Sequence, residues 1–382
     1  MFKNNLENLK LTLKNNNIDL AIITDDDSLY YFTGYYDFLH MSFGRPTILI
    51  VPKDSDTILI TPLIDVKLIS KDCPVDKIIT WNDGVGDEWR EYLSKYRKNK
   101  ISVGIEKFKI NSLVLNYLSA LFDQNKFNNI SPYLDSIRMI KTQDELKIAK
   151  SAGKVAMAMM QAGKEAIVSN VPEYEVALAT SQAGTRKAAE ILNNEFEESD
   201  MSPMVHFLQI MASGKDLPKT HHRASTKLIK EGDPVFLCFC GMTNFHKFKL
   251  GFDRTFWLKE IIDKTQIKTY ETAVKSQQAA LDVLGPGVMA EEVHAAYADF
   301  IQSAGYPYPT FRCGRATGFS MLEEPQLVAG NQTILQPGMV FAVDGSANEE
   351  NFRAQVGDSF IITNDGYEQI THFSKEIEDV II

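Results

Sequence analysis

The chain is poor in cysteine, with only four in 382 residues: Cys73, Cys238, Cys240 and Cys313. Their irregular spacing argues against a disulfide framework, and no CxxC pairs suggest a zinc site. Cys238 and Cys240 stand two apart in "PVFLCFCG", so both side chains lie on the same face of a strand. We interpret this pair as buried thiols.

The sequence also has no excess of basic residues and no long hydrophobic run. It has 40 Lys and Arg against 50 Asp and Glu, a formal net charge of -10, which argues against a nucleic-acid binding surface. No stretch reaches the length of a membrane span, and "MFKNNLENLKLTLKNNNIDLAIIT" lacks the continuous apolar segment of a secretory signal. These absences predict a cytoplasmic protein that binds neither nucleic acid nor membrane.

The length and the 44% content of hydrophobic residues fit two domains better than one ordinary core. In the first third, short apolar runs such as "PTILIVP" and "ISVGIE" alternate with helical patterns, which predicts a small α/β domain over 1–137. Two long helical patterns then lead into further strands and helices, and "NDG" near the end is a hairpin signal. We therefore predict an α+β domain with an antiparallel sheet over 138–382.

Charged residues inside apolar runs are the strongest candidates for function, because burying a charge is unfavourable unless something compensates it. "LGFDRTF", residues 250–256, places Asp253 beside Arg254 in a run that is typical of a buried strand. Neighbouring side chains in a strand point to opposite faces, so these two cannot easily pair with each other. Asp253 is therefore expected to meet a partner elsewhere in the fold or a ligand.

Other polar residues lie at the ends of apolar strands or in glycine-bearing turns: His221, His222, Asp344, Arg315 and Arg45. A histidine pair with two aspartates can bind a metal ion, transfer protons, or be satisfied within the core. The residues alone leave these three alternatives open.

The order of segments resembles the "pita-bread" family, which includes methionine aminopeptidases, Xaa-Pro dipeptidases and creatinase. The catalytic-domain resemblance is carried by "SGKDLPKTHHRASTKLIKEGDPVFL", "GFDRTFWL", "LQPGMVFAVDGS" and "GDSFIITNDGYEQIT". "YYFTGYYDFLHMSFGRPTILIV" and "IRMIKTQDELKIAKSA" are similar to the family's N-terminal domain and connecting helix. The resemblance implies a small creatinase-type domain followed by a pita-bread catalytic domain.

The peptidases of this family hold two metal ions with two aspartates, one histidine and two glutamates. By the resemblance, the five corresponding positions here are Cys240, Gly251, Arg315, Asp344 and Gly357. One oxygen ligand of five remains, and a fixed positive charge stands where the histidine is expected. We therefore expect no metal ion and no other cofactor, which makes a metallopeptidase the less favoured interpretation.

Creatinase works without a metal ion, and its site residues can be carried over by the same resemblance. The carry-over gives a catalytic set of His221, Asp253 and Asp344 and a substrate-binding set of Phe43, Arg45, Arg315 and His222. The chain departs from creatinase at Arg315, where creatinase has histidine, and at Gln326, where it has a second arginine. Both acids are also shorter than the glutamates of creatinase, which argues against creatine itself as the substrate.

These residues suggest a substrate with opposite charges at its two ends. Arg45 would bind a carboxylate, while Asp253 and Asp344 would hold a cationic head. His221, with a reference pKa near ~6.5, would move a proton to the leaving nitrogen. The prediction is a metal-independent hydrolase of a C–N bond in a small zwitterion, acting as a homodimer with an active site shared between subunits.

Two alternatives to this hydrolase remain open. One is a lyase that acts on a small zwitterion such as dimethylsulfoniopropionate. The other is a catalytically retired binding module in which Arg315 fills the former metal pocket. The substrate, the choice between hydrolysis and elimination, and the position of the Arg315 guanidinium do not follow from the sequence.

Overall fold

The structure is a computed structural model that describes residues 1–35, 46–82, 88–98, 101–123, 127–204, 210–240, 245–320 and 322–382. It divides into two compact units, Met1–Arg138 and Met139–Ile382, one residue away from the division drawn from the sequence. Within the described ranges, no helix combines the length and the apolar composition that crossing a bilayer requires.

The first unit is built on a mixed six-stranded sheet with the order β4-β3-β2-β1-β5-β6. The strands are β1 (Leu20–Ile23), β2 (Ile48–Pro52), β3 (Ile58–Pro62), β4 (Lys77–Trp81), β5 (Val103–Ile105) and β6 (Phe127–Asn129). The helices are α1 (Phe2–Asn15), α2 (Asp26–Thr33), α3 (Glu88–Ser94), α4 (Ser112–Leu121) and α5 (Ser131–Met139), with 3₁₀ turns η1 (Leu63–Leu68) and η2 (Lys95–Lys98). Strand pairs β1–β5, β3–β4 and β5–β6 are parallel.

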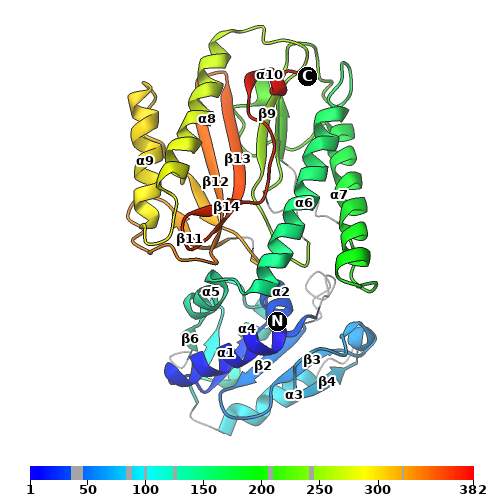
Figure 1. Ribbon diagram of the computed structural model, residues 1–382. Helices are drawn as coiled ribbons and strands as arrows, with labels where there is room; N and C mark the ends of the chain where they lie inside the picture. Colours follow the sequence, from blue (N-terminus) through cyan, green and yellow to red (C-terminus); the bar gives the residue numbers. More distant parts are fainter. Residues whose placement is uncertain are drawn as a thin grey trace. The chain divides into compact units, whose positions relative to one another are not determined.

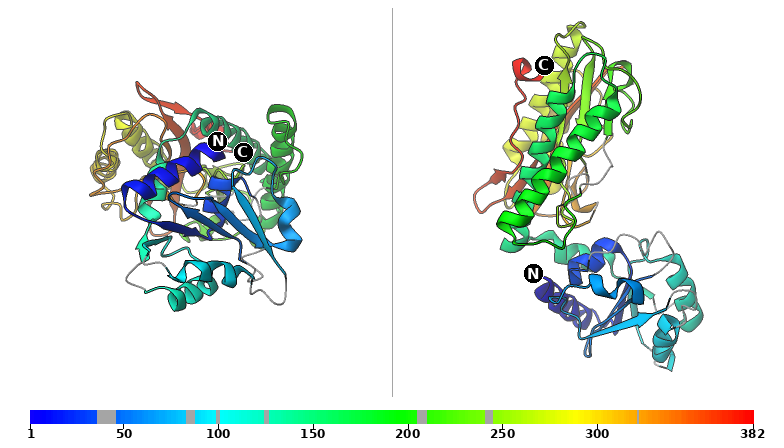
Figure 2. Two further views of the ribbon diagram at one scale, coloured as in Figure 1. Left: turned by 90° about the horizontal axis from the view of Figure 1, so that it is seen from below. Right: turned by 90° about the vertical axis from the view of Figure 1, so that its right-hand side faces the viewer.

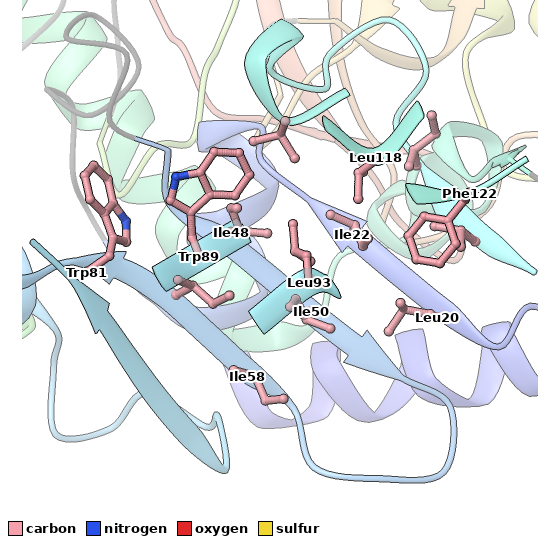
Figure 3. Packing of buried hydrophobic residues seen from close by; sticks show 14 residues of the cluster. Leu20, Ile22, Ile48, Ile50, Ile58, Trp81, Trp89, Leu93, Leu118 and Phe122 are labelled. Carbon is pink, nitrogen blue, oxygen red and sulfur yellow. The ribbon is translucent and has the colours of Figure 1, made fainter. Parts of the chain in front are cut away.

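Apolar strands and one helix face build the core of this unit. All four residues of β1 and all five of β2 are buried, which is typical of strands covered on both sides. Figure 3 shows side chains of these strands packed around Trp89 and Leu93 of α3 and Leu118 of α4. The short apolar runs of the sequence thus form an α/β unit, as predicted.

The second unit carries an antiparallel sheet with the order β11-β10-β12-β13-β9-β8-β7, with β14 paired to β13. The strands are β7 (Ile210–Ser213), β8 (Pro234–Cys238), β9 (Asp253–Trp257), β10 (Gly314–Ala316), β11 (Glu323–Leu327), β12 (Val340–Asn348), β13 (Arg353–Ile362) and β14 (Tyr367–Gln369). The helices are α6 (Gln143–Ala166), α7 (Glu173–Glu195), α8 (Thr265–Val283), α9 (Ala290–Ser303) and α10 (Ile377–Val380), with a 3₁₀ turn η4 (Gly214–Asp216).

Helix α6 begins where the sequence places helix-favouring charge. Thr142 is its N-cap, and the side chains and backbones of Thr142 and Glu145 form a reciprocal capping box. Asp144 and Glu145 add negative charge to the first turn, which the helix dipole favours. Helices α6 and α7 run side by side, as do α8 and α9 (Figures 1 and 2).

Glycines allow two helices to approach one face of this sheet closely. A Cβ on Gly345 of β12 would lie 2.1 Å from the Ala273 carbonyl oxygen of α8. A Cβ on Gly163 of α6 would lie 2.7 Å from Leu237 of β8. We call the face that these helices cover the helix face. The opposite face carries Cys238, Asp253 and Asp344, and we call it the site face. Successive side chains of a strand alternate between the two faces.

Arg254 points to the helix face, as the alternation of the strand predicts. Its Nη2 donates to Asp358 Oδ1 at 2.8 Å, and both side chains are fully buried. Gln277 of α8 and Lys375 donate to the other oxygen of Asp358, each at 3.2 Å. Asp253 and Arg254 therefore do not pair through their side chains, which confirms that part of the sequence analysis.

Candidate functional site

Four residues form one lateral row across the site face. Strand register places Cys238 opposite Asp253, Asp253 opposite Gly357, and Gly357 opposite Asp344. Directly opposed residues of antiparallel strands point to the same side of the sheet. The row therefore brings residues of β8, β9, β13 and β12 together, although they are spread over more than a hundred positions of the chain.

Two carboxylates of this row converge over a residue without a side chain. A Cβ on Gly357 would lie 2.3 Å from Asp344 Oδ1 and 2.8 Å from Asp253 Oδ2. Asp344 Oδ1 is buried and has no hydrogen-bond partner among the residues that the structure describes. Burial, followed by the charges of Asp253 and Cys240, raises the pKa of Asp344 well above its ordinary value. Burial thus favours the protonated form of Asp344 more than water does.

The thiols and a guanidinium lie at the β8 end of the row. Cys240 Sγ is 3.9 Å from Asp253 Oδ1. A hydrogen bond from Cys238 and the nearby positive charge of Arg315 lower the pKa of Cys240 to about 7, against the opposing effect of burial. The charges of Cys240 and Asp344 in turn raise the pKa of Arg315. The site thus places acids, thiols and a fixed cation together.

Strand β13 supplies two further polar side chains on the same face. Gln355 Nε2 donates to Asp253 Oδ2 at 2.6 Å and fixes the orientation of that carboxylate. Arg353 contacts Gln355 and lies over the ring of Phe236, with its guanidinium carbon 4.9 Å from the ring centroid. Arg353, Gln355 and Gly357 follow each other at a period of two, so all three face the site.

A cavity of about 180 Å³ lies beside the C-terminal end of β12. Ser346, two residues beyond Asp344, and Asn348 form part of its wall, and Tyr297, Tyr306 and Phe311 supply aromatic surface. A larger cavity of about 610 Å³ lies beside α6 and β13, and its lining includes four lysines. Neither cavity is lined by a residue of the row, and we assign the site to the row because it brings the buried acids and the thiols together.

Only some of the predicted site residues lie together in the structure. Asp253, Asp344 and Arg315 meet on the site face, as the acid and cation positions of the resemblance imply. His221 is exposed, and within the described ranges it forms no hydrogen bond or ion pair with either acid. His222 is half-buried, and its Nδ1 lies 2.8 Å from the Met211 carbonyl oxygen and 4.0 Å from Glu173 Oε2.

Phe43 and Arg45 lie outside the described residues, so their predicted contact with a substrate carboxylate remains a prediction. The catalytic role of His221 and the binding role of His222 also remain predictions. Gln326 accepts a hydrogen bond from Arg312 at 3.2 Å, next to Arg315 on the paired strand.

Two features of the site were not predicted from the sequence: the presence of both thiols in it and the contact of Gln355 with Asp253. We interpreted Cys238 and Cys240 as buried thiols, and Cys238 is buried, but Cys240 is partly exposed and both sulfur atoms belong to the site. The spacing of two in "LCFC" places both side chains on one face, and that was the available signal. Gln355 gave no comparable signal, because only the register of β13 with β9 shows that it reaches Asp253.

The five positions do not fit the pair of metal ions that the resemblance implies. A side chain on Gly251 would meet Ala342, whose Cβ lies 2.4 Å from the place of the missing Cβ. Gly357 leaves no room for a longer acid, because Asp344 and Asp253 already occupy that space. Arg315 adds a buried positive charge beside Cys240. An oxygen-rich site for two cations needs several carboxylates at close range, and these residues do not supply them.

Comparison with known proteins places the chain among peptidases. Residues 147–364 match the model of "Metallopeptidase family M24", and residues 5–140 match that of the "Creatinase/Prolidase N-terminal domain". The chain is 27% identical to the Xaa-Pro dipeptidase of Lactobacillus helveticus, with 99% of both chains covered. It is 24% identical to the agropine synthesis cyclase of Rhizobium rhizogenes, which covers 98% of this chain and 96% of that protein.

Solved structures show the same fold over both units. The prolidase of Thermococcus sibiricus matches 99% of this chain and 98% of its own chain, with a TM-score of 0.85 and 23% identity. The prediction of a creatinase-type domain followed by a pita-bread catalytic domain is confirmed.

The predicted function is wrong. We expected a metal-independent, creatinase-like hydrolase of non-peptide C–N bonds, whereas several relatives along the full chain are Xaa-Pro dipeptidases, and the matched family is one of metallopeptidases. The creatinase-like function was inferred from single residues, whereas the similarity to dipeptidases extends along both units. The chain belongs to metallopeptidase family M24, a family of hydrolases, and carries the N-terminal domain shared by creatinases and prolidases.

Proposed function

We propose that the chain is a dipeptidase that hydrolyses the peptide bond of short zwitterionic peptides, including those that end in proline. The observation that carries the proposal is the pair of carboxylates that converge over Gly357. The names of full-length relatives, Xaa-Pro dipeptidases from Lactobacillus helveticus and Pyrococcus furiosus, support the choice of substrate class.

The charges on the site face suit a dipeptide, which carries an ammonium group at one end and a carboxylate at the other. Arg315 and Arg353 are fixed cations that can bind a carboxylate. Asp253 can accept a hydrogen bond from an ammonium group through the oxygen that Gln355 does not occupy. The aromatic cavity beyond Asp344 offers apolar surface for one side chain of the peptide or for a proline ring.

Hydrolysis requires that water add to the carbonyl carbon, that the C–N bond break, and that the leaving nitrogen gain a proton. Asp344 is suited to give that proton, because burial and the charge of Asp253 raise its pKa. Asp253 lies across Gly357 and can accept a proton from the attacking water. We expect Asp344 to act as the acid and Asp253 as the base.

The test is a panel of dipeptides that end in proline or alanine, followed by proton NMR with the purified full chain. The panel is run with added Zn²⁺, Co²⁺ or Mn²⁺ and with a chelator. Asp344→Asn is the diagnostic variant, and Asp299→Asn, an exposed acid on α9, is the matched control. Cleavage that Asp344→Asn abolishes and Asp299→Asn preserves supports the proposal, whereas a panel without cleavage under any condition overturns it.

A second candidate is intramolecular ring closure. It is favoured by the replacement of the expected ligands at Gly251 and Gly357, together with full-length similarity to an agropine synthesis cyclase. Ring closure with loss of water needs the same donation and acceptance of a proton as hydrolysis does. The NMR spectra distinguish the two, because hydrolysis gives two products and ring closure gives one.

A further inference from the structure

The proposed acid pair does not use the two thiols, which form a group with Asp253, one of its two acids. One ligand atom from each of Cys238, Cys240 and Asp253 lies within 4.8 Å of the others, and Cys240 Sγ lies 3.9 Å from Asp253 Oδ1. In a tetrahedral zinc site, bond lengths of about 2.3 Å to sulfur and about 2.0 Å to oxygen place the ligand atoms roughly 3.5–3.8 Å apart. A small contraction of this group would therefore enclose an ion.

The orientation of Asp253 agrees with a ligand role. Its Oδ2 accepts the hydrogen bond from Gln355, which leaves Oδ1 directed toward the sulfur atoms. Outer hydrogen bonds of this kind fix the ligating oxygen of a carboxylate and increase metal affinity. Gln355 thus has the position of a residue that supports a metal ligand.

The charges also balance around a single ion. Two thiolates and one carboxylate carry three negative charges, so a bound divalent cation leaves one negative charge. The guanidinium of Arg315, which lies beside Cys240 and is buried, can offset it. The same guanidinium would oppose a second cation, which matches the poor fit of a two-ion site.

We propose that Cys238, Cys240 and Asp253 bind one thiophilic divalent cation, such as Zn²⁺ or Co²⁺, at the position where the family places two oxygen-liganded ions. Thiolate ligands select zinc and cobalt over magnesium, calcium and manganese. Binding releases the protons of both thiols to solvent, so affinity rises with pH. Three protein ligands would leave a fourth position for water or a substrate atom.

The test is a titration of the reduced, metal-free full chain with Co²⁺, followed by the thiolate-to-cobalt charge-transfer band in the near ultraviolet. The expected result is one equivalent of Co²⁺ with the visible bands of a tetrahedral ion, displaced by Zn²⁺. Cys238→Ser and Cys240→Ser should lose the charge-transfer intensity, and Gln355→Leu should weaken binding by about 10–100-fold. Cys73→Ser, in the first unit, is the matched control and should bind like the parent chain.

Several results would overturn the proposal: no charge-transfer band, a band that survives both serine variants, or a disulfide between Cys238 and Cys240 as the stable state of the purified chain. X-ray absorption of the zinc-loaded parent chain counts sulfur ligands without any variant, so a misfolded variant does not leave the question open. A spectrum without sulfur ligands rejects the site.

The consequence of this ion for catalysis rests on the proposed dipeptidase function, but its binding does not. If Co²⁺ binds through the thiols and no dipeptide is cleaved, the metal site stands and the proposed function falls. If dipeptides are cleaved and no thiolate–cobalt band forms, the function stands and this site falls.

Discussion

The two faces of the sheet in the second unit differ in how completely their buried charged side chains are paired. On the helix face, Arg254 and Asp358 pair at 2.8 Å, and Gln277, Lys375 and backbone carbonyls complete their hydrogen bonds. On the site face, which is the opposite side of the same sheet, Asp344 Oδ1 lacks a partner among the described residues. It lies close to a second acid, Asp253.

The difference separates structural charge from functional charge within a single strand. Asp253 and Arg254 are adjacent, and both are fully buried. Only Arg254 has its hydrogen-bonding capacity filled by neutralising and polar partners. On this sheet, the unpaired acid oxygen therefore distinguishes the site face from the helix face better than burial does.

The largest expected effect is the loss of activity in Asp344→Asn. Asparagine keeps the shape of the protonated acid but cannot donate the proton, so we expect turnover of a cleaved dipeptide to fall by about 10²–10⁴-fold. Stability should not fall, because no described hydrogen bond depends on the lost carboxylate oxygen. Steady-state kinetics and a denaturant titration on the same sample check both statements. A variant that lost stability and activity together would remove the contrast between the faces.

Arg254→Met tests the helix face. Removing Arg254 breaks this buried pair and leaves Asp358 with Lys375 as its remaining described cationic partner, so we expect unfolding free energy to fall by about 3–5 kcal/mol. Lys275→Met, which removes an exposed pair with Glu271 on α8, is the control and should change stability by less than about 0.5 kcal/mol. Denaturant unfolding of the two variants measures the difference. Equal effects would show that the helix-face pair is not structurally important.

Gly357→Ala tests whether the close approach of the two acids matters. The added methyl group would lie 2.3 Å from Asp344 Oδ1, so it must push the acids apart. We expect a stability cost of about 1–3 kcal/mol and a fall in activity that exceeds the loss of folded protein. Gly285→Ala, just after α8, controls for the loss of a glycine, because its added Cβ meets nothing within 4 Å. Activity that is unchanged in Gly357→Ala would remove the acid pair from the mechanism.

The smallest expected effect is on the pH dependence of stability. The pKa of Asp344 is higher in the folded chain than in the unfolded chain. Between the two pKa values, Asp344 is therefore protonated in the folded chain and ionised in the unfolded chain. The native state therefore binds more protons in that interval, and stability falls as pH rises from about 4 toward the folded pKa. One such group contributes at most about 1.4 kcal/mol per pH unit. Denaturant midpoints from pH 5 to pH 8 should fall less steeply in Asp344→Asn, and identical slopes would contradict the raised pKa.

The sequence allowed prediction of the fold because its patterns are local. The run of apolar residues in β2 and the capping residues of α6 determine these elements within a few positions. The site depends instead on strand register, which joins Cys238 to Asp344 through two intervening strands. Asp253 and Asp344 could be identified as charges in apolar runs, but Gln355 and the spatial role of Gly357 depend on contacts over about a hundred residues.

The packing around Gly251 and Gly357 has a consequence for the evolutionary paths open to this chain. An acidic residue introduced at either position meets an occupied volume, Ala342 in one case and the two aspartates in the other. A single substitution toward the usual ligand set would therefore be harmful before it could be useful. Return to a two-ion centre requires several coordinated substitutions, so epistasis between these positions keeps the present chemistry in place.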